Sequence, residues 1–541
     1  MSSNEKNPNQ DPAVNEELRQ PETAEAKAPE TPAPQPSKAA VKTAREAKQR
    51  KEEKRSNVLY ASIAVIFVVV AASVLIWNSG IFQRGATAAV VNGEKYSAAE
   101  VQYYYGSVYQ SFINNNYYYL SYLGLDTSKD MRDQTCAMDS SGMTWFDYFS
   151  QQALQQMSHV HALAAKAEAA GLTWNDEMQE MYDSNMAQLE ANTLSYNQAQ
   201  NTNLSTKDYI ARLYGELVTQ SVYEKQLKTA IQAQVYANNY TDSLDYTDDQ
   251  LEAAYAQDPR TYDRADYESV RVKGTAPTTT DANGNTVEAT DAEKEQAKAD
   301  AKALAEDIYA SFQNGAELSA LADGDKSVYT DGTHSSYYSS TLLDWVFDDA
   351  RSAGDSAVLF DESSTTYYVV VFHDRYRDEY NTVNVRHILI QPEAGEKAAG
   401  DEGYEDEVAQ LNADAKAKAE DLLAQWKAGA ATEDSFAQLA EEHSTDGGSN
   451  TNGGLYTQVY QGEMVQSFND WCFDSARRTG DTGIVETDYG YHIMYFVGKD
   501  MPYWQLQATN TLMNEDCSAW YTENTKDASY EIRDGGMKYV G

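Results

Sequence analysis

The second half of this chain contains one pattern of landmarks twice, and this repeat limits the possible folds more than any other feature. Each copy has a strand-like segment, a helix-like segment, a segment of the form DWxFDxAR and a final β-rich run, in the same order. Four landmarks in one order indicate two copies of a single α+β unit. The matched segments are 267–274 with 380–387, 307–322 with 421–440, 343–359 with 469–485, and 367–372 with 491–496.

A second constraint lies near the start of the chain, where residues 56–83 carry no charge. About 20 apolar residues cross a bilayer core, so we predict a transmembrane anchor over 56–80. Seven Lys and Arg residues lie in 42–55. The positive-inside rule therefore predicts that the N-terminus is cytosolic and that the chain after Gly85 is extracytoplasmic. A cleaved signal peptide is disfavoured because its charged region would be 55 residues long.

Residues 1–55 are expected to form a disordered cytosolic tail. Seven of the eleven prolines of the chain fall in its first 41 residues, among Glu, Ala, Gln and Asn. The formal net charge of −42 argues against a nucleic-acid partner, which requires a basic surface. Three cysteines at unrelated positions give no metal-ligand spacing, so we expect neither a metal nor a cofactor.

Between the anchor and the repeats, the pattern is helical. A short hairpin is predicted over 90–97, with Asn-Gly at its turn. Helices are predicted after it over 98–114, 145–170, 174–192 and 206–235.

The two copies differ at two histidines. Matching 267–274 to 380–387 places Gly274 opposite His387, and matching the final runs places Tyr368 opposite His492. Two unrelated core histidines are not expected to come and go as a pair, whereas two halves of one site are. Antiparallel neighbouring strands would bring the two rings into contact.

Five motifs make the second copy resemble the parvulin (PpiC-type) peptidyl-prolyl isomerases. They are VRHILI, FAQLAEEHSTD, GGLY, GEMVQSF and VETDYGYHI, between residues 385 and 493. The resemblance implies a central histidine pair, His387 and His492, with Asp446 beside the isomerising bond. It also implies that Leu455, Met464 and Phe468 line a pocket for the proline ring. Thr487 would belong to a hydrogen-bonded network behind the histidines. The sequence departs from the family at Tyr456, where a glycine is usual.

The whole chain resembles the PrsA/SurA-like extracytoplasmic foldases, which combine parvulin domains with a helical chaperone region starting at a VNGE strand, here 91–94. The predicted fold is therefore α+β, with one transmembrane helix, a helical chaperone-like lobe and two tandem parvulin-like domains, the first degenerate. The resemblance also implies that the C-terminal segment returns to complete the helical lobe, with 504–520 as a candidate helix and 530–540 as a candidate hairpin. The predicted parts are the tail 1–55, the anchor 56–80, the helical lobe 86–245, the degenerate copy 262–376, the parvulin copy 381–499 and the C-terminal segment 503–541.

The function expected from this reading is a membrane-anchored isomerase and chaperone. Its partners would be unfolded or nascent secreted polypeptides with X-Pro bonds, and the membrane through its N-terminal helix; a homodimer is also compatible with the sequence. An alternative is a non-catalytic holdase that uses the parvulin fold to bind peptide. A surface scaffold is a third reading, which no wall-binding repeat or sorting signal supports.

Overall fold

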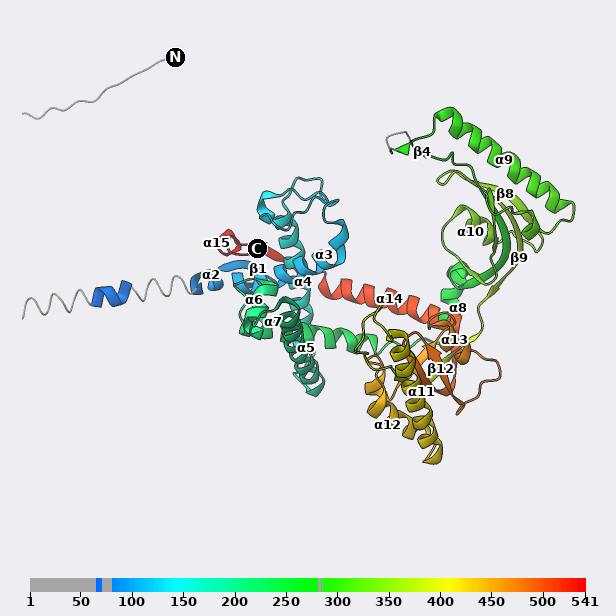
Figure 1. Cartoon of the computed structure of the whole chain (residues 1–541). Coiled ribbons are helices and arrows are strands. Elements are labelled where there is room, and N and C mark those ends of the chain that lie inside the picture. The colour runs from blue at the N-terminus through cyan, green and yellow to red at the C-terminus, as the bar shows by residue number, and fades with distance from the viewer. Residues whose placement is uncertain (1–64, 71–79, 281–283, 285) are drawn as a thin grey trace, which may run out of the picture. The chain divides into compact units, whose positions relative to one another are not determined.

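The computed structural model describes residues 65–70, 80–280, 284 and 286–541. The predicted tail 1–55 and most of the predicted anchor 56–80 lie outside these residues. The chain divides into two compact regions, Met1–Ala86 and Thr87–Gly541. In the N-terminal region, residues 65–70 are helical and α2 spans Ile81–Gly85 (Figure 1). No helix among the described residues has the length and apolar character needed to cross a membrane.

The region Thr87–Gly541 begins with a helical lobe, drawn in blue to green in Figure 1. Its hairpin turns at Asn92 and Gly93, both of which have positive φ (51° and 87°), as an Asn-Gly hairpin turn requires. The predicted hairpin is confirmed. The elements of this lobe are β1 (Thr87–Val91), β2 (Glu94–Ser97), α3 (Ala98–Asn116), η1 (Tyr117–Tyr119), η2 (Met131–Asp133), α4 (Trp145–Ala169), α5 (Asp176–Gln200), α6 (Thr206–Tyr214) and α7 (Gln220–Thr241).

The single helix predicted over 206–235 is wrong, because the chain breaks between α6 and α7. Gly215 ends α6 with φ at 105°, a conformation that other residues rarely adopt. A Cβ at Gly215 would also lie 2.6 Å from Nε2 of Gln102, so α3 packs directly against this turn.

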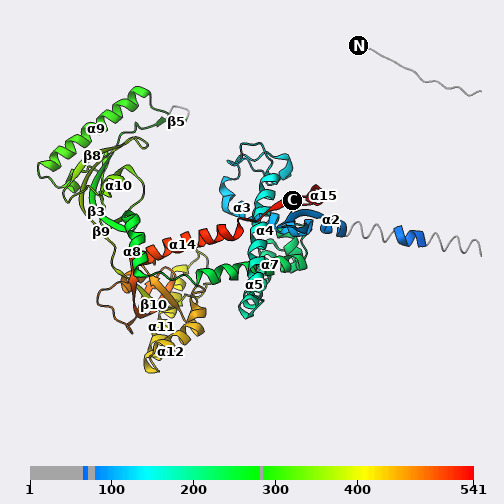
Figure 2. The ribbon, with the colours of Figure 1, turned by 180° about the vertical axis from the view of Figure 1, so that it is seen from behind.

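The C-terminal segment lies against the N-terminal hairpin. Strand β14 (Tyr530–Ile532) pairs antiparallel with β1, which gives the sheet order β14-β1-β2. The hairpin expected within 530–540 is wrong: β14 is followed by the helix α15 (Asp534–Met537), which contacts β1. The long helix α14 (Tyr503–Thr525) precedes β14 and contacts β13, α8, α7 and α4 (Figure 2).

The two repeats fold as two α+β units with matching antiparallel sheets, as predicted. The first has the strand order β6-β3-β9-β8 and the second β11-β10-β13-β12. The first comprises α8 (Asp248–Gln257), η3 (Pro259–Thr261), β3 (Asp263–Lys273), β4 (Thr279–Thr280), β5 (Thr286–Val287), α9 (Asp291–Gln313), η4 (Leu318–Leu321), β6 (Ser327–Asp331), β7 (Ser335–Ser336), α10 (Thr341–Val346), β8 (Ser356–Asp361) and β9 (Thr366–Arg377). The second comprises β10 (Asn381–Ile390), α11 (Tyr404–Ala428), α12 (Glu433–His443), η5 (Asn450–Asn452), β11 (Leu455–Val459), α13 (Gln466–Cys472), β12 (Thr482–Thr487) and β13 (Gly490–Pro502).

The register of these sheets corrects the sequence match of the first strands. Ser269 pairs with Val370, and His387 pairs with Met494. The central pair of strands has a register shift at the corresponding place in both units, between Asp266 and Tyr267 and between 384 and 385. Ser269 is therefore the counterpart of His387, and the placement of Gly274 opposite it is wrong. Alternating strands look alike at several offsets, and only the hydrogen-bond register selects one.

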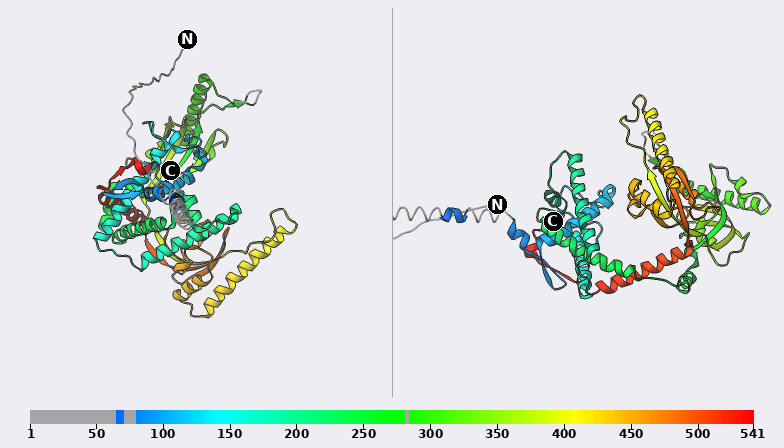
Figure 3. Two further views of the ribbon diagram at one scale, coloured as in Figure 1. Left: turned by 90° about the vertical axis from the view of Figure 1, so that its left-hand side faces the viewer. Right: turned by 90° about the horizontal axis from the view of Figure 1, so that it is seen from below.

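The sheet of the second unit separates two apolar layers. On one face, α11 and α12 cover Ile388, Ile390 and Ile493; Figure 3 shows α11 as the long yellow helix beside this sheet. On the other face, Val385, Met494 and Phe496 pack with Phe468 of α13. Because side chains alternate along a strand, His387 and His492 share the second face.

We predict that Gly536→Ala destabilises the helical lobe, because a Cβ at Gly536 would lie 2.3 Å from the carbonyl oxygen of Thr87. An overpacked buried contact of this kind costs about 1–3 kcal/mol. Thermal unfolding followed by circular dichroism should show a lower midpoint for Gly536→Ala. The neighbouring Gly535→Ala is the control, because nothing lies within 4 Å of its Cβ position; equal effects of the two substitutions would contradict the packing of α15 on β1.

Candidate active site

The site is centred on a contact between two buried imidazoles from neighbouring antiparallel strands. His387 lies on β10 and His492 on β13, and they are 3% and 6% exposed. Their Nδ1 atoms are 3.0 Å apart, and the rings are stacked with centroids separated by 5.2 Å. The predicted contact between the two histidines is confirmed.

The outer nitrogen of each ring has its own partner. His387 Nε2 lies 2.9 Å from Oδ2 of Asp446 and 3.0 Å from Oγ of Ser449. His492 Nε2 lies 2.8 Å from Oγ1 of Thr487. The four groups Thr487, His492, His387 and Asp446 thus form one continuous chain of hydrogen bonds.

Asp446 is an ionised carboxylate. Burial would by itself raise its pKa, but hydrogen bonds from Ser449, Tyr456 and His387 outweigh burial and lower the pKa to about 2. The Tyr456 hydroxyl donates to Oδ2 over 3.0 Å, and the Ser449 hydroxyl donates to the same atom. A carboxylate that accepts several hydrogen bonds is a weak base.

The charge on Asp446 sets the direction of the whole chain of hydrogen bonds. A carboxylate only accepts, so His387 carries its proton on Nε2 and its Nδ1 accepts from Nδ1–H of His492. His492 Nε2 then accepts from the hydroxyl of Thr487. In this arrangement both imidazoles are neutral and all four ring nitrogens are satisfied.

The pKa values of the two histidines agree with neutral rings. Burial lowers the pKa of His387, although Asp446 opposes this effect. Burial and the adjacent His387 together lower the pKa of His492 to about 4. Desolvation disfavours the charged form of an imidazole.

An aromatic and sulfur-containing wall covers this polar chain. The ring of Phe468 stands edge-on to His387 and His492, with centroid distances of 5.5 and 5.4 Å. Met464 is partly exposed and packs against the apolar cluster that contains Phe468, Met494 and Phe496. Leu455 lies on β11 opposite Arg386, is partly exposed, and is outside that cluster; its contact with substrate stays a prediction.

Two residues of the site were not expected from the sequence. Tyr456 was noted only as a departure from the family, yet its ring lies 5.1 Å from that of His387 and its hydroxyl holds Asp446. Ser449 is fully buried and bonds both Asp446 and His387. The available signal was the spacing of Asp446 and Ser449, three residues apart in a loop, where a hydroxyl can reach back to a carboxylate.

The first unit lacks this chemistry. Its register places Ser269 at the position of His387 and Tyr368 at the position of His492, so no imidazole pair forms there. Among the described residues of the chain, no three His, Cys, Asp or Glu side chains are arranged to hold a metal ion.

Comparison with known protein families identifies a domain that covers nearly all of the second α+β unit and begins in β9 of the first. Residues 367–499 match the family described as the PPIC-type PPIase domain. The chain contains a parvulin domain. Because the match includes His387, Asp446 and His492, the hydrogen-bonded chain described above lies inside the parvulin domain.

The chain also has distant homologues among the PrsA foldases. It is 27% identical over 172 residues to foldase protein PrsA 1 of Listeria innocua, a match covering 30% of this chain and 49% of the relative. The corresponding protein of Listeria monocytogenes is 29% identical over 134 residues, covering 23% and 44%. The chain thus spans about half the length of the curated relatives it matches.

The comparison with solved structures finds PrsA from Bacillus subtilis. It is 12% identical, with a TM-score of 0.30, and the match covers 75% of this chain and 97% of that one. A SurA-like chaperone of Campylobacter jejuni is 15% identical, with a TM-score of 0.17 and coverage of 65% and 84%.

We predict that the stability of the parvulin domain falls as the pH drops from 7 to 5. The pKa of His492 is about 4 in the folded domain and near 6.5 in an unfolded chain, so between these values protons bind preferentially to the unfolded state and stability rises with pH. The expected loss from pH 7 to pH 5 is about 2 kcal/mol. Urea unfolding at the two pH values, with a ¹³C-NMR titration of the imidazole, measures both quantities.

His443, which is partly exposed at the C-terminal end of α12, supplies the control for this experiment. His443→Gln should keep the pH dependence of the wild type, whereas His492→Gln should reduce it; the remainder comes from His387, whose pKa burial also lowers. A His492 pKa at or above 6.5 would contradict the neutral, buried pair.

Proposed function

We propose that this chain is a membrane-anchored, extracytoplasmic foldase whose parvulin domain isomerises X-Pro bonds in unfolded secreted polypeptides. The helical lobe holds these polypeptides, and the first α+β unit is an inactive copy. The parvulin domain and the distant PrsA homologues support this function. The anchor and its orientation rest on the uncharged segment 56–83 and the basic residues before it.

The reaction itself requires rotation about one amide bond and no group transfer. The barrier of roughly 20 kcal/mol arises from lost resonance in the twisted amide. A twisted amide is less polar than the planar one, so an apolar pocket that holds the proline ring and excludes water favours it. Phe468 and Met464 supply such a surface next to the polar chain.

In this mechanism the histidines act as positioning residues. Each of their four ring nitrogens already has a hydrogen-bond partner, so neither ring offers a free base or nucleophile. Their role is to fix Asp446 and the floor of the pocket in one geometry. A fully satisfied buried network is rigid, whereas a partly satisfied one is costly.

Asp446 is the polar group that meets the substrate. Its side chain is 20% exposed, whereas that of His387 is 3% exposed. A fixed negative charge beside the amide favours the rotamer whose carbonyl oxygen points away from it. The observation that carries the proposal is therefore the continuous series of hydrogen bonds from Thr487 through His492 and His387 to Asp446. It lies beside the apolar ring of Phe468.

The proposal predicts X-Pro isomerisation by the full chain, kept in mild detergent because of the apolar segment 56–83. Exchange NMR on a panel of X-Pro peptides should show faster interconversion with the wild type. Asp446→Ala should lower kcat/KM at least about tenfold, which corresponds to about 1.4 kcal/mol of transition-state stabilisation. His492→Ala should lower it as well, because the pair that positions Asp446 is lost.

The matched control is Tyr368→Ala, at the position of the first unit that corresponds to His492. It should leave the exchange rate unchanged if the reaction occurs in the second unit alone. A folded wild-type protein that suppresses aggregation of an unfolded client but accelerates no peptide of the panel would overturn the enzyme and support the holdase.

A further inference from the structure

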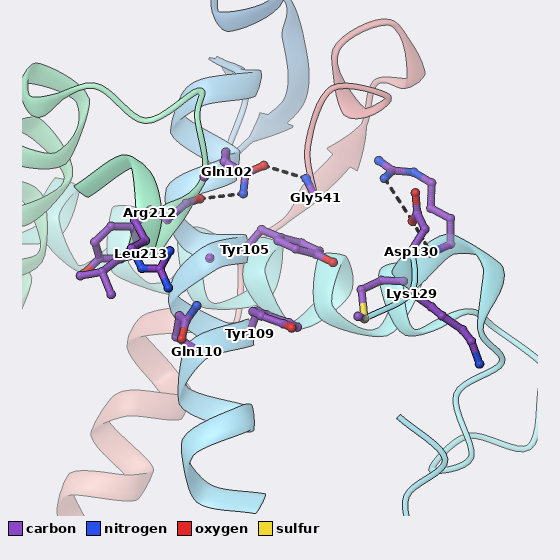
Figure 4. A pocket seen from close by; sticks show the side chains of 14 residues that line it. Gln102, Tyr105, Tyr109, Gln110, Lys129, Asp130, Arg212, Leu213 and Gly541 are labelled. Atoms are coloured by element: carbon purple, nitrogen blue, oxygen red, sulfur yellow. Dashed lines mark hydrogen bonds and ion pairs between the residues drawn. The ribbon is translucent and has the colours of Figure 1, made fainter. Parts of the chain in front are cut away.

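A pocket of about 370 Å³ lies in the helical lobe, outside the parvulin domain. It is formed by α3, by the segment 129–132 and by the C-terminal end of α6. Figure 4 shows Tyr105 and Tyr109 projecting from α3 toward the segment of Lys129 and Asp130, with Arg212 on the other side of α3 in this view. This volume is large enough for a short peptide segment.

The wall of this pocket contains an unsatisfied hydrogen-bonding group. Tyr105 is 4% exposed, and within the described part of the chain its hydroxyl has no hydrogen-bond partner. Its ring is held against Phe146 and Phe149, with centroids at 5.6 and 6.1 Å. A buried hydroxyl without a partner is costly, and one that lines a cavity gains its partner when a ligand enters.

Three cations, Lys129, Arg132 and Arg212, and one carboxylate, Asp130, line the pocket, although the chain carries a net charge of −42. Lys129 is already paired with Asp126 at 3.0 Å, and Arg132 lies 3.9 Å from Asp130 and donates to the carbonyl of Val540. Arg212 differs from both. Among the described residues it has no carboxylate within 4.0 Å, and its guanidinium lies over the ring of Tyr196 at 4.9 Å. A cation is therefore available for an anionic ligand in this pocket.

The pocket is formed before any ligand binds. The Gln102 side chain donates to the carbonyl of Tyr214 over 2.7 Å and accepts from the amide of Gly541 over 2.7 Å, so it ties together three segments of the wall. At Gly106 a Cβ would lie 2.7 Å from the backbone of Tyr214, which shows how closely α3 and α6 approach. A rigid site loses little entropy on binding.

We propose that this pocket binds an extended peptide segment that carries a carboxylate. The carboxylate lies against Arg212, a neighbouring apolar side chain packs on Tyr109, and a peptide carbonyl accepts a hydrogen bond from the hydroxyl of Tyr105. The Gln110 amide, which also lines the pocket, can pair with the peptide backbone in any sequence. This inference rests on the proposed function, since it names the class of client segment that the helical lobe holds.

The test is fluorescence anisotropy with the full chain and a labelled, proline-free peptide that has blocked termini and one Glu among Leu, Val and Ala. The peptide with Gln in place of Glu should bind about five- to tenfold more weakly. Arg212→Gln should reduce affinity for the Glu peptide to that for the Gln peptide and remove most of the dependence on salt. A Gln peptide with a free C-terminal carboxyl group separates the two sources of a carboxylate, side chain and chain end.

Two variants keep this test independent of folding. Tyr105→Phe retains the ring and removes the unpaired hydroxyl, so its melting temperature should not fall, while affinity for the Glu peptide should drop about two- to tenfold. Lys207→Gln removes an exposed cation of α6 that does not line the pocket, and should bind as the wild type does. Equal affinities for the Glu and Gln peptides, or unchanged binding by Tyr105→Phe, would overturn the proposal.

Failure of the isomerase proposal gives a different pattern. Because the peptides contain no proline, their binding reports on the pocket alone. A wild-type protein that binds the Glu peptide more tightly than the Gln peptide but accelerates no X-Pro exchange would overturn the isomerase proposal alone, and the opposite result would overturn the pocket proposal alone.

Discussion

A hydrogen bond between two buried neutral imidazoles joins the two central strands of the parvulin domain at its candidate active site. His387 and His492 each place one nitrogen toward the other and one toward an outer partner, Asp446 with Ser449 at one end and Thr487 at the other. Removing Thr487 would leave Nε2 of His492 without this partner, and a buried nitrogen without a partner costs more than an ordinary hydrogen bond contributes. Removing Asp446 would leave Ser449 as the remaining partner of Nε2 of His387. The central strand pair β10 and β13, the loop after α12 and the end of β12 are consequently fixed relative to one another.

The first unit shows what the same sheet becomes without this pair. It keeps the strand order and the register shift of the second unit, but Ser269 and Tyr368 replace the histidines. The packing in this unit is close: a Cβ at Gly332 would lie 2.4 Å from the ring of Tyr267. Apolar packing on both faces of the sheet therefore suffices for the fold of the first α+β unit, which has no imidazole pair.

The helical lobe depends on residues far apart in the sequence. β14 completes the sheet of the N-terminal hairpin, and Gln102 joins α3 to α6 and to Gly541. Since α14 contacts β13 as well as α4 and α7, the segment that closes the lobe is also joined to the parvulin domain. In the proposed function, the lobe that holds a client and the sheet that isomerises its X-Pro bond are therefore joined by α14.

The sequence by itself determined the two α+β units, most of the helices and the pairing of His387 with His492. These features follow from local periodicity and from a repeat, and both are visible without coordinates. Tertiary structure decided the break at Gly215, the pairing of β14 with β1 and the match of His387 with Ser269, because each depends on hydrogen-bond register or on a close approach between distant segments. It also decided that Ser449 and Tyr456 hold Asp446, since a hydroxyl reveals its partner only when the loop that carries it is folded against the strand.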